Sequence, residues 1–448
     1  MAEAGCNNLS GMGEEIVRLA FQALSPTQWS TWLTAPLFGA ATEGDFSLVT
    51  LLLEEGASCK SDEIYTGWTL LHAAAVGGNA DIMKAVLKQA PGRKKLETKL
   101  GRQRQTPLCV AAQMGHVAVV RALIRAGADT EATGLCGSTP LHEACKRGHH
   151  EVAVDLIMNG AKVGTRDNDG WTALHCAAHN GKLEVVKVLL RASAELELRS
   201  FAKNWSALDL AAVNGHVDVI IELAGDGADI NARSDSGLSA LSAAVIYTQA
   251  ATARALVEMG ATVDVEGPAN FTALHYAAQN DFADGIRILV QGGAEMERLD
   301  QGGWTPLHVA CWSVSRSAVH ALLCLGANEA AADKRGKTPF EVVPQHAADA
   351  GKTKHVHRML ARAPAIRAWQ RRGWLVMLRA RHRATGEEAR GSCMASKDTS
   401  QSGNIDSAVR GGLRKNLEKE QEGALSEAMS LLVGLKEEDL FKIVILFV

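Results

Sequence analysis

No stretch of the chain contains the roughly 20 consecutive apolar residues that a membrane-spanning helix requires. The longest such run, residues 443–448, is only a short tail. The first residues are polar and acidic, without the charged and apolar regions of a secretory signal. We therefore expect a soluble intracellular protein in the cytoplasm, and a nuclear location is also compatible with these features.

The nine cysteines are odd in number, are scattered along the chain and form no C-x-x-C pair. This distribution argues against a disulfide framework or a zinc ribbon and favours a reducing compartment. The net charge of −3 gives the chain as a whole no bias towards nucleic acid. We expect no nucleic-acid partner, no metal and no cofactor.

A recognisable set of catalytic residues is also missing. Two Gly-Lys-Thr triplets, at 336–338 and 351–353, lack the upstream glycine that a phosphate-binding loop requires. The position of that glycine holds Ala331 in one case and His346 in the other. Neither a nucleophile with its base nor a convincing pair of carboxylates stands out. The sequence therefore predicts a protein that is not an enzyme.

What the chain has in abundance is one short motif. The sequence Gly-Trp-Thr-Ala-Leu-His at 170–175 recurs as close variants at 67–72 and 303–308. Its leucine marks nine copies in steps of 33 or 34 residues, with one step of 37, and Phe340 marks a degraded tenth. The nine positions are Leu37, Leu71, Leu108, Leu141, Leu174, Leu208, Leu241, Leu274 and Leu307.

The copies carry the signals of a helix start and a helix end, although the first has Ala35 in place of the hydroxyl residue. A hydroxyl residue two positions before the leucine can cap a helix, and proline follows it in several copies. Alanine stands three positions after the leucine in all nine copies. Glycine stands seven positions after it in the first six, where it can take the left-handed conformation that ends a helix. A second apolar helix and a turn rich in Asp and Gly complete the unit.

This period, together with the Thr-Pro-Leu-His-x-Ala signature, resembles the ankyrin repeat family over about residues 29–343. The resemblance implies an all-α fold: an ankyrin-repeat solenoid of stacked helix-turn-helix units with hairpin loops, here followed by C-terminal helices. One unit alone cannot bury its apolar face, whereas stacked units can. The resemblance also implies that the protein binds other proteins.

We expect the histidines of the motif to be structural, because an imidazole at that position can hydrogen-bond locally and tie a hairpin to its helix. His175 and His179 also have the spacing of a zinc-binding pair. His175 is assigned to the scaffold, however, and no fourth ligand is near in the sequence. The histidines of the motif are His72, His142, His175, His275 and His308.

One column of the repeat varies while its neighbours stay nearly constant, which indicates a surface that the fold does not fix. It lies three positions before the leucine, and the resemblance implies that it contacts partners, as do the positions five and six after the leucine. The column holds Trp68, Gln105, Ser138, Trp171, Trp205, Leu238, Phe271, Trp304 and Lys337.

Aromatic residues, which are common interface anchors, gather in the C-terminal copies. There the helix-ending glycine is replaced by Thr248, Asp281 and Val314. The alternative is that the hairpin tryptophans pack across to the next hairpin as structural staples, whereas Tyr247 and Trp312 are expected to be exposed. The predicted partner-binding residues are Trp171, Trp205, Tyr247, Phe271, Tyr276, Trp304 and Trp312.

The step of 37 residues between Leu71 and Leu108 contains a basic insertion. Such an enlarged loop can bind an acidic partner or simply be a solvated loop, and both interpretations stay open. The basic residues predicted to form the contact are Arg93, Lys94, Lys95, Arg102 and Arg104.

The sequence divides into five segments. They are a helical leader at 1–28, the repeat array at 29–345, a basic amphipathic helical segment at 346–386, a flexible linker at 387–407 and a helix with an apolar end at 408–448. The basic segment includes Trp369, Arg371, Arg372 and Trp374. It can bind a calmodulin-like protein or an anionic membrane surface, or it can fold back on the last copy.

Two functions therefore stay open. The first is a non-catalytic scaffold or adaptor that binds a partner protein through the concave face and hairpin tips of the array. The second is an adaptor regulated by a calmodulin-like protein or an anionic membrane through the basic segment. The identity of the partner and the oligomeric state do not follow from the sequence.

Overall fold

The computed structural model describes residues 34–54, 57, 69–89, 96–99, 104–134, 136–344 and 351–364. Within these ranges the regular elements are helices, and no β-strand occurs. This confirms the all-α fold. The predicted leader at 1–28, the linker at 387–407 and the helix at 408–448 lie outside the described residues.

Each copy of the motif forms two antiparallel helices. The first helices are α3 (Thr34–Glu43), α5 (Leu70–Gly77), α8 (Pro107–Met114), α10 (Pro140–Arg147), α12 (Ala173–His179), α14 (Ala207–Asn214), α16 (Ala240–Ile246), α18 (Ala273–Gln279) and α20 (Pro306–Trp312). The second helices are α4 (Phe46–Glu54), α6 (Ala80–Gln89), α9 (Val117–Arg125), α11 (His150–Met158), α13 (Leu183–Arg191), α15 (Val217–Gly225), α17 (Ala250–Glu258), α19 (Ala283–Gln291) and α21 (Arg316–Leu325).

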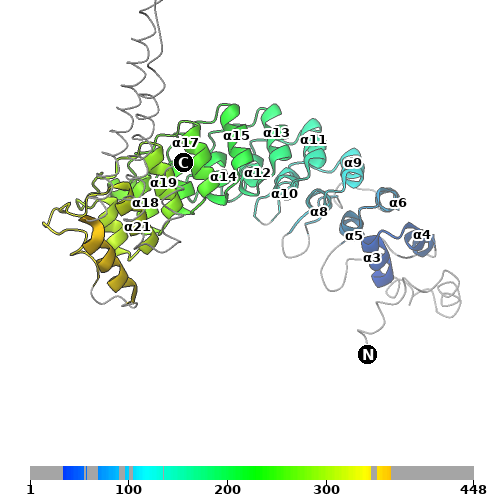
Figure 1. Cartoon of the computed structure of the whole chain (residues 1–448). Helices are drawn as coiled ribbons and strands as arrows, with labels where there is room; N and C mark the ends of the chain where they lie inside the picture. The colour runs from blue at the N-terminus through cyan, green and yellow to red at the C-terminus, as the bar shows by residue number, and fades with distance from the viewer. Residues whose placement is uncertain are drawn as a thin grey trace, which may run out of the picture. The chain divides into compact units, whose positions relative to one another are not determined.

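The helices stack in two rows. Every first helix packs on the first helix of the next copy, and every second helix packs on the next second helix. Figure 1 shows α9, α11, α13 and α15 in one row beside α8, α10, α12 and α14 in the other. From α11 to α20, where the connections are fully described, a β-hairpin-like loop joins each second helix to the next first helix, and one of these loops contains the short 3₁₀ helix η1 (Pro268–Asn270).

Small and apolar side chains at fixed positions form one continuous core. The nine motif leucines are at most 3% exposed, and so are the nine alanines that follow three positions later. Because alanine adds so little bulk, adjacent first helices approach closely and the leucines fill the space between layers. The periodic pattern of the sequence is therefore the pattern of the core.

The predicted helix starts are confirmed. Thr106 has an extended backbone, and its hydroxyl accepts a hydrogen bond from the backbone N–H of Cys109 at 3.3 Å. Pro107 follows as the first helical residue, where its missing N–H costs no hydrogen bond. Thr139, Thr172, Ser206 and Thr305 cap their helices in the same way.

The predicted helix ends are also confirmed, with one unexpected feature. Gly215 has a φ of 79°, and a Cβ there would lie 2.5 Å from Oε1 of Gln249. In the last three copies Thr248, Asp281 and Val314 keep the same left-handed backbone, with φ of 57°, 55° and 56°. The fold thus imposes this conformation even where glycine is absent, which costs backbone energy at β-branched residues.

The C-terminal end of the array is closed by a helix over residues 351–364. Its Val356, Leu360 and Ala363 are buried in the core cluster, and the ring of His357 lies 4.7 Å from that of Phe340. The degraded tenth copy, which ends at Pro344, forms turns instead of a helix. The described part of the basic segment therefore caps the last repeat, as an end repeat with a polar outer face does in repeat proteins.

Candidate partner-binding surface

The hairpin position that carries the tryptophans is held by its backbone, not by its side chain. In the hairpin at Trp171, the backbone N–H of Asp167 donates to the Trp171 carbonyl at 2.9 Å. The Asp167 carboxylate accepts from the Trp171 N–H at 2.8 Å. Asp300 holds Trp304 in the same way, at 3.0 and 2.7 Å. Because this anchor uses only main-chain atoms of the tryptophan, it makes no demand on the side chain at this position.

A histidine of the preceding copy completes this anchor. Nε2 of His142 lies 3.0 Å from the Trp171 carbonyl, and Nε2 of His175 lies 3.1 Å from the Trp205 carbonyl. A carbonyl oxygen only accepts hydrogen bonds, so Nε2 carries the proton and donates. The other ring nitrogen, Nδ1, accepts the backbone N–H of the capping threonine. His72, His275 and His308 make the same bridge to Gln105, Trp304 and Lys337.

These imidazoles are neutral in the folded protein. Burial lowers the pKa of His175 to about 4, and it also lowers the pKa of His142, His275 and His308 below the ordinary value. A protonated Nδ1 could not accept from the threonine N–H, which adds a second reason for the neutral form. The structural role expected for these histidines is thus confirmed by their contacts.

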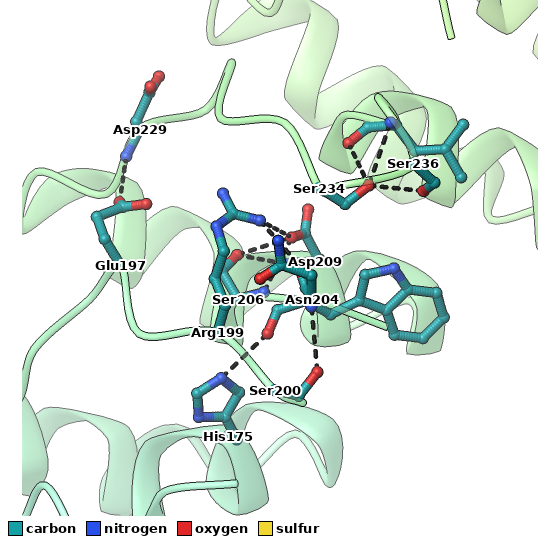
Figure 2. A network of polar contacts seen from close by, with 12 residues as sticks. His175, Glu197, Arg199, Ser200, Asn204, Ser206, Asp209, Asp229, Ser234 and Ser236 are labelled. Carbon is teal, nitrogen blue, oxygen red and sulfur yellow. Dashed lines mark hydrogen bonds and ion pairs between the residues drawn. The ribbon is translucent and has the colours of Figure 1, made fainter. Parts of the chain in front are cut away.

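The bridge is replaced by a different polar network in the copy that begins at Ser206 (Figure 2). Asp209 stands where the histidine should be, and its Oδ2 accepts from the backbone N–H and the hydroxyl of Ser206, both at 3.0 Å. Arg199 Nη1 lies 3.5 Å from the same oxygen. Burial is the main influence on the Asp209 carboxyl and raises its pKa. A carboxylate has no proton to donate, so it cannot bridge to the next hairpin.

The hairpin aromatics contact aromatic rings on the first helices. Trp304 lies 5.6 Å from Trp312 between ring centroids, and Phe271 lies 5.3 Å from Tyr276. Trp205 meets Tyr247 of the next copy edge to face at 6.3 Å. The structure therefore brings together the two sets of positions that the sequence singled out. We call the surface formed by Trp171, Trp205, Tyr247, Phe271, Tyr276, Trp304 and Trp312 the aromatic surface.

Exposure differs within the aromatic surface. Trp312 is 55% exposed and Tyr247 is 43% exposed, as expected for residues away from the hairpins. Trp171, Trp205 and Trp304 are half-buried. The indole N–H of Trp304 donates to Oδ2 of Asp333 in the next hairpin at 3.1 Å. This tryptophan therefore acts as a structural staple, although part of its ring is exposed.

Three neighbours of the aromatic surface were not among the predicted partner-binding residues. His179 lies 5.0 Å from Trp171 between ring centroids, and Lys203 Nζ lies 4.4 Å from the centre of the Trp205 ring. Asp333 accepts the Trp304 N–H. His179 stands five positions after Leu174, in a column that the resemblance assigns to partner contact, and Asp333 stands one period after Asp300, but neither was linked to a particular ring. No periodic signal marked Lys203. Their contacts depend on which hairpins stand side by side.

Positive charge collects at the C-terminal end of the aromatic surface. The last hairpin exposes Lys334, Arg335 and Lys337. Its Asp333 carboxylate accepts backbone N–H groups of Arg335 and Lys337, both at 2.8 Å, which helps to lower its pKa. The 351–364 helix adds further exposed cations, namely Lys352, Lys354, Arg358 and Arg362.

The basic residues predicted elsewhere stay predictions. Of the five basic residues predicted to form the contact of the insertion, only Arg104 is described, and it is exposed, with a φ of 48°. Arg93, Lys94, Lys95 and Arg102 lie outside the described residues, as do Trp369, Arg371, Arg372 and Trp374 of the tail. Within the insertion, Glu97 Oε1 accepts the Asp129 N–H at 2.8 Å, which links this part of the loop to the turn after α9.

The described part of the chain holds no group of three or more His, Cys, Asp or Glu side chains placed to bind a metal ion. Burial raises the pKa of Cys109 to about 11 and that of Cys176 to about 12, which keeps both thiols protonated and unreactive at neutral pH. Among the described helices, none combines the length and the apolar character needed to cross a bilayer.

Family models match most of the repeat array. A family model described as "Ankyrin repeats (3 copies)" matches residues 37–134, 126–200 and 241–333, and one described as "Ankyrin repeat" matches residues 203–235. Protein ACCELERATED CELL DEATH 6 of Arabidopsis thaliana is 32% identical over 92 residues, which make up 20% of this chain and 13% of that protein. The crystal structure of the human ASB11 ankyrin repeat domain matches with 23% identity and a TM-score of 0.43, over 58% of this chain and 98% of that one.

Proposed function

Because the chain belongs to the ankyrin repeat family, whose repeats are in general protein-interaction modules, we propose that it is a non-catalytic scaffold that binds a partner protein through the aromatic surface. The observation that carries the proposal is the exposure of Trp312 and Tyr247 beside hairpin rings. Large aromatic side chains at a rigid, half-exposed surface supply much contact area at a low cost in conformational entropy.

The backbone next to these rings supports the same assignment. Thr248, Asp281 and Val314 follow the exposed ends of α16, α18 and α20 and keep a left-handed conformation without glycine. Stability alone would favour glycine at these positions, since L-residues pay about 1–2 kcal/mol there. Strain retained at three successive helix ends beside the aromatic surface is typical of a functional region.

The experiment is affinity capture from the native cell with the full-length protein and with a Trp312→Ala, Tyr247→Ala double variant. We expect the affinity of the double variant for its partner to be lower by about 30-fold or more. This is the effect of removing an interface anchor worth at least ~2 kcal/mol. Both side chains are exposed, so the variant should fold, which circular dichroism checks. Unchanged capture by a folded double variant would show that this surface is not the site.

Matched controls come from the second helices. Met158 on α11 is 79% exposed and Ile221 on α15 is 52% exposed, so Ile221 matches the two aromatic residues in exposure and Met158 exceeds them. Because they lie on the other row of helices, their replacement by alanine should leave capture of the same partner unchanged. An equal loss in these controls would point to general destabilisation of the array.

The alternative role of the basic segment is limited by its packing. A calmodulin-like groove binds the apolar face of a helix, and in the 351–364 helix that face is buried on the last repeat. Such a partner would need the residues after 364. Deletion of residues 365–448 keeps the capping helix, so we expect it to preserve partner capture. Loss of capture in this variant would favour the basic segment as the working part.

A further inference from the structure

We propose that the aromatic surface recognises an extended peptide in the polyproline II conformation. This peptide carries an apolar side chain at every third residue and acidic residues at the end that lies over the last hairpin. The inference rests on the proposed function and adds the chemistry of the partner. It is carried by two regular rows of side chains and by the charge at one end.

The first row is apolar and has one member in each layer. Five successive hairpins place a large apolar side chain at the same position, and all five are half-buried: Trp171, Trp205, Leu238, Phe271 and Trp304. Packed helices lie about 8–10 Å apart, so the row repeats at about that distance. Polyproline II has three residues per turn and rises 3.1 Å per residue, so every third side chain recurs after about 9 Å on the same side.

The second row consists of hydrogen-bonding groups at the ends of the first helices. Asn180, Asn214 and Asn280 occupy the same position in their copies, and Tyr247 occupies it in the copy between the last two. Each asparagine Nδ2 donates inside the array, to Cys176 at 2.8 Å, Leu210 at 2.8 Å and Ile246 at 2.9 Å respectively. The nitrogen is thereby fixed, and the amide oxygen is left to accept a hydrogen bond from a ligand.

These two rows favour polyproline II over the other regular conformations. A β-strand turns every third side chain to the opposite face, and its same-face repeat of about 7 Å is too short. An amphipathic helix presents apolar groups about every 5 Å and satisfies its own backbone N–H groups, so it has no use for a row of acceptors. Polyproline II makes no internal hydrogen bonds and offers its backbone to the asparagines.

The charge of the last hairpin determines which end of the peptide lies over it. The row of apolar side chains runs into the hairpin that exposes Lys334, Arg335 and Lys337. The two carboxylates of this region, Asp333 and Glu341, already accept backbone N–H groups of their own turns. Both carboxylates remain charged, but three cations face these two anions, so an acidic ligand end meets a net positive charge here and a basic end is repelled.

The test uses synthetic peptides of about 15 residues, three for each of five layers, with repeated Leu-Pro-Ala units and glutamates at one end or the other. Binding to the full-length protein is followed by fluorescence anisotropy. We expect one of the two glutamate peptides to bind. We expect about tenfold weaker binding when the leucines are moved to every second residue, and again when lysines replace the glutamates.

Protein variants complete the test. Trp304→Ala should weaken the binding peptide about tenfold, and Met158→Ala should not. A Lys334→Glu, Arg335→Glu variant should reverse the preference, so that the lysine peptide binds better than the glutamate peptide. Equal binding of the respaced peptide, no binding of either glutamate peptide, or an unreversed charge preference would overturn the inference. If capture of the cellular partner still depends on Trp312 and Tyr247 in that case, only the chemistry assigned to the partner is wrong.

Discussion

Acid should weaken the array through its buried histidines, and His175 allows the size of this effect to be worked out. Its pKa is about 4 in the folded protein, and an unfolded histidine has a pKa of about 6.5. The difference of ~2.5 units, at about 1.4 kcal/mol per unit, corresponds to ~3.5 kcal/mol. This is a large part of the 5–15 kcal/mol that typically stabilises a folded domain.

The direction follows from proton binding. Between about pH 6.5 and pH 4 the unfolded chain holds a proton on this histidine and the folded chain does not. The free energy of unfolding is therefore highest above pH 6.5 and falls by ~1.4 kcal/mol per pH unit as the pH is lowered through this window. The pKa values of His142, His275 and His308 are lowered too, so these residues act in the same direction.

A His175→Gln variant isolates the contribution. Glutamine does not titrate, so the variant should lose ~1.4 kcal/mol per unit of the pH dependence between pH 6.5 and 4. It should also be less stable at pH 7 by about 1–3 kcal/mol, because the bridge to the Trp205 carbonyl is broken. Urea unfolding, followed by circular dichroism at several pH values, gives both quantities.

An NMR titration of the imidazole measures the pKa directly, which matters because repeat arrays do not always unfold in one step. The reasoning is refuted if His175 in the folded protein titrates near 6.5. It is refuted as well if wild type and His175→Gln show the same pH dependence of unfolding.

Three further outcomes are expected. Asp209→His should raise the free energy of unfolding by ~1 kcal/mol in urea titrations, since Nε2 of the new histidine can donate to the next hairpin. A loss of stability would show that Arg199 requires the carboxylate. Thr248→Gly should stabilise the array by up to ~1 kcal/mol, because glycine tolerates a φ of 57°. An unchanged free energy of unfolding would show that Thr248 is not strained. Gly215→Ala should destabilise the array by at least ~1 kcal/mol, because the new side chain would occupy a left-handed backbone and its Cβ would lie 2.5 Å from Oε1 of Gln249. A melting temperature equal to that of the wild type would contradict this.

The sequence by itself determined the repeat, the helix boundaries and the core. These features depend on local signals: a hydroxyl caps the helix that it precedes, and a leucine or alanine at a fixed position faces the same neighbour in every layer. The number of copies and their register could therefore be counted before any coordinates were known. The helix caps at Thr106 and Ser206 agree with that count.

The tertiary structure alone decided what happens between repeats. The pairing of Trp205 with Tyr247 and the staple from Trp304 to Asp333 join residues of different copies, so they depend on side-chain packing that no period encodes. The same holds for the 351–364 helix, whose amphipathic pattern suited a partner or the array equally well. It docks because the last repeat leaves an apolar end uncovered, and burial of that end against the nearest apolar helix face lowers the free energy.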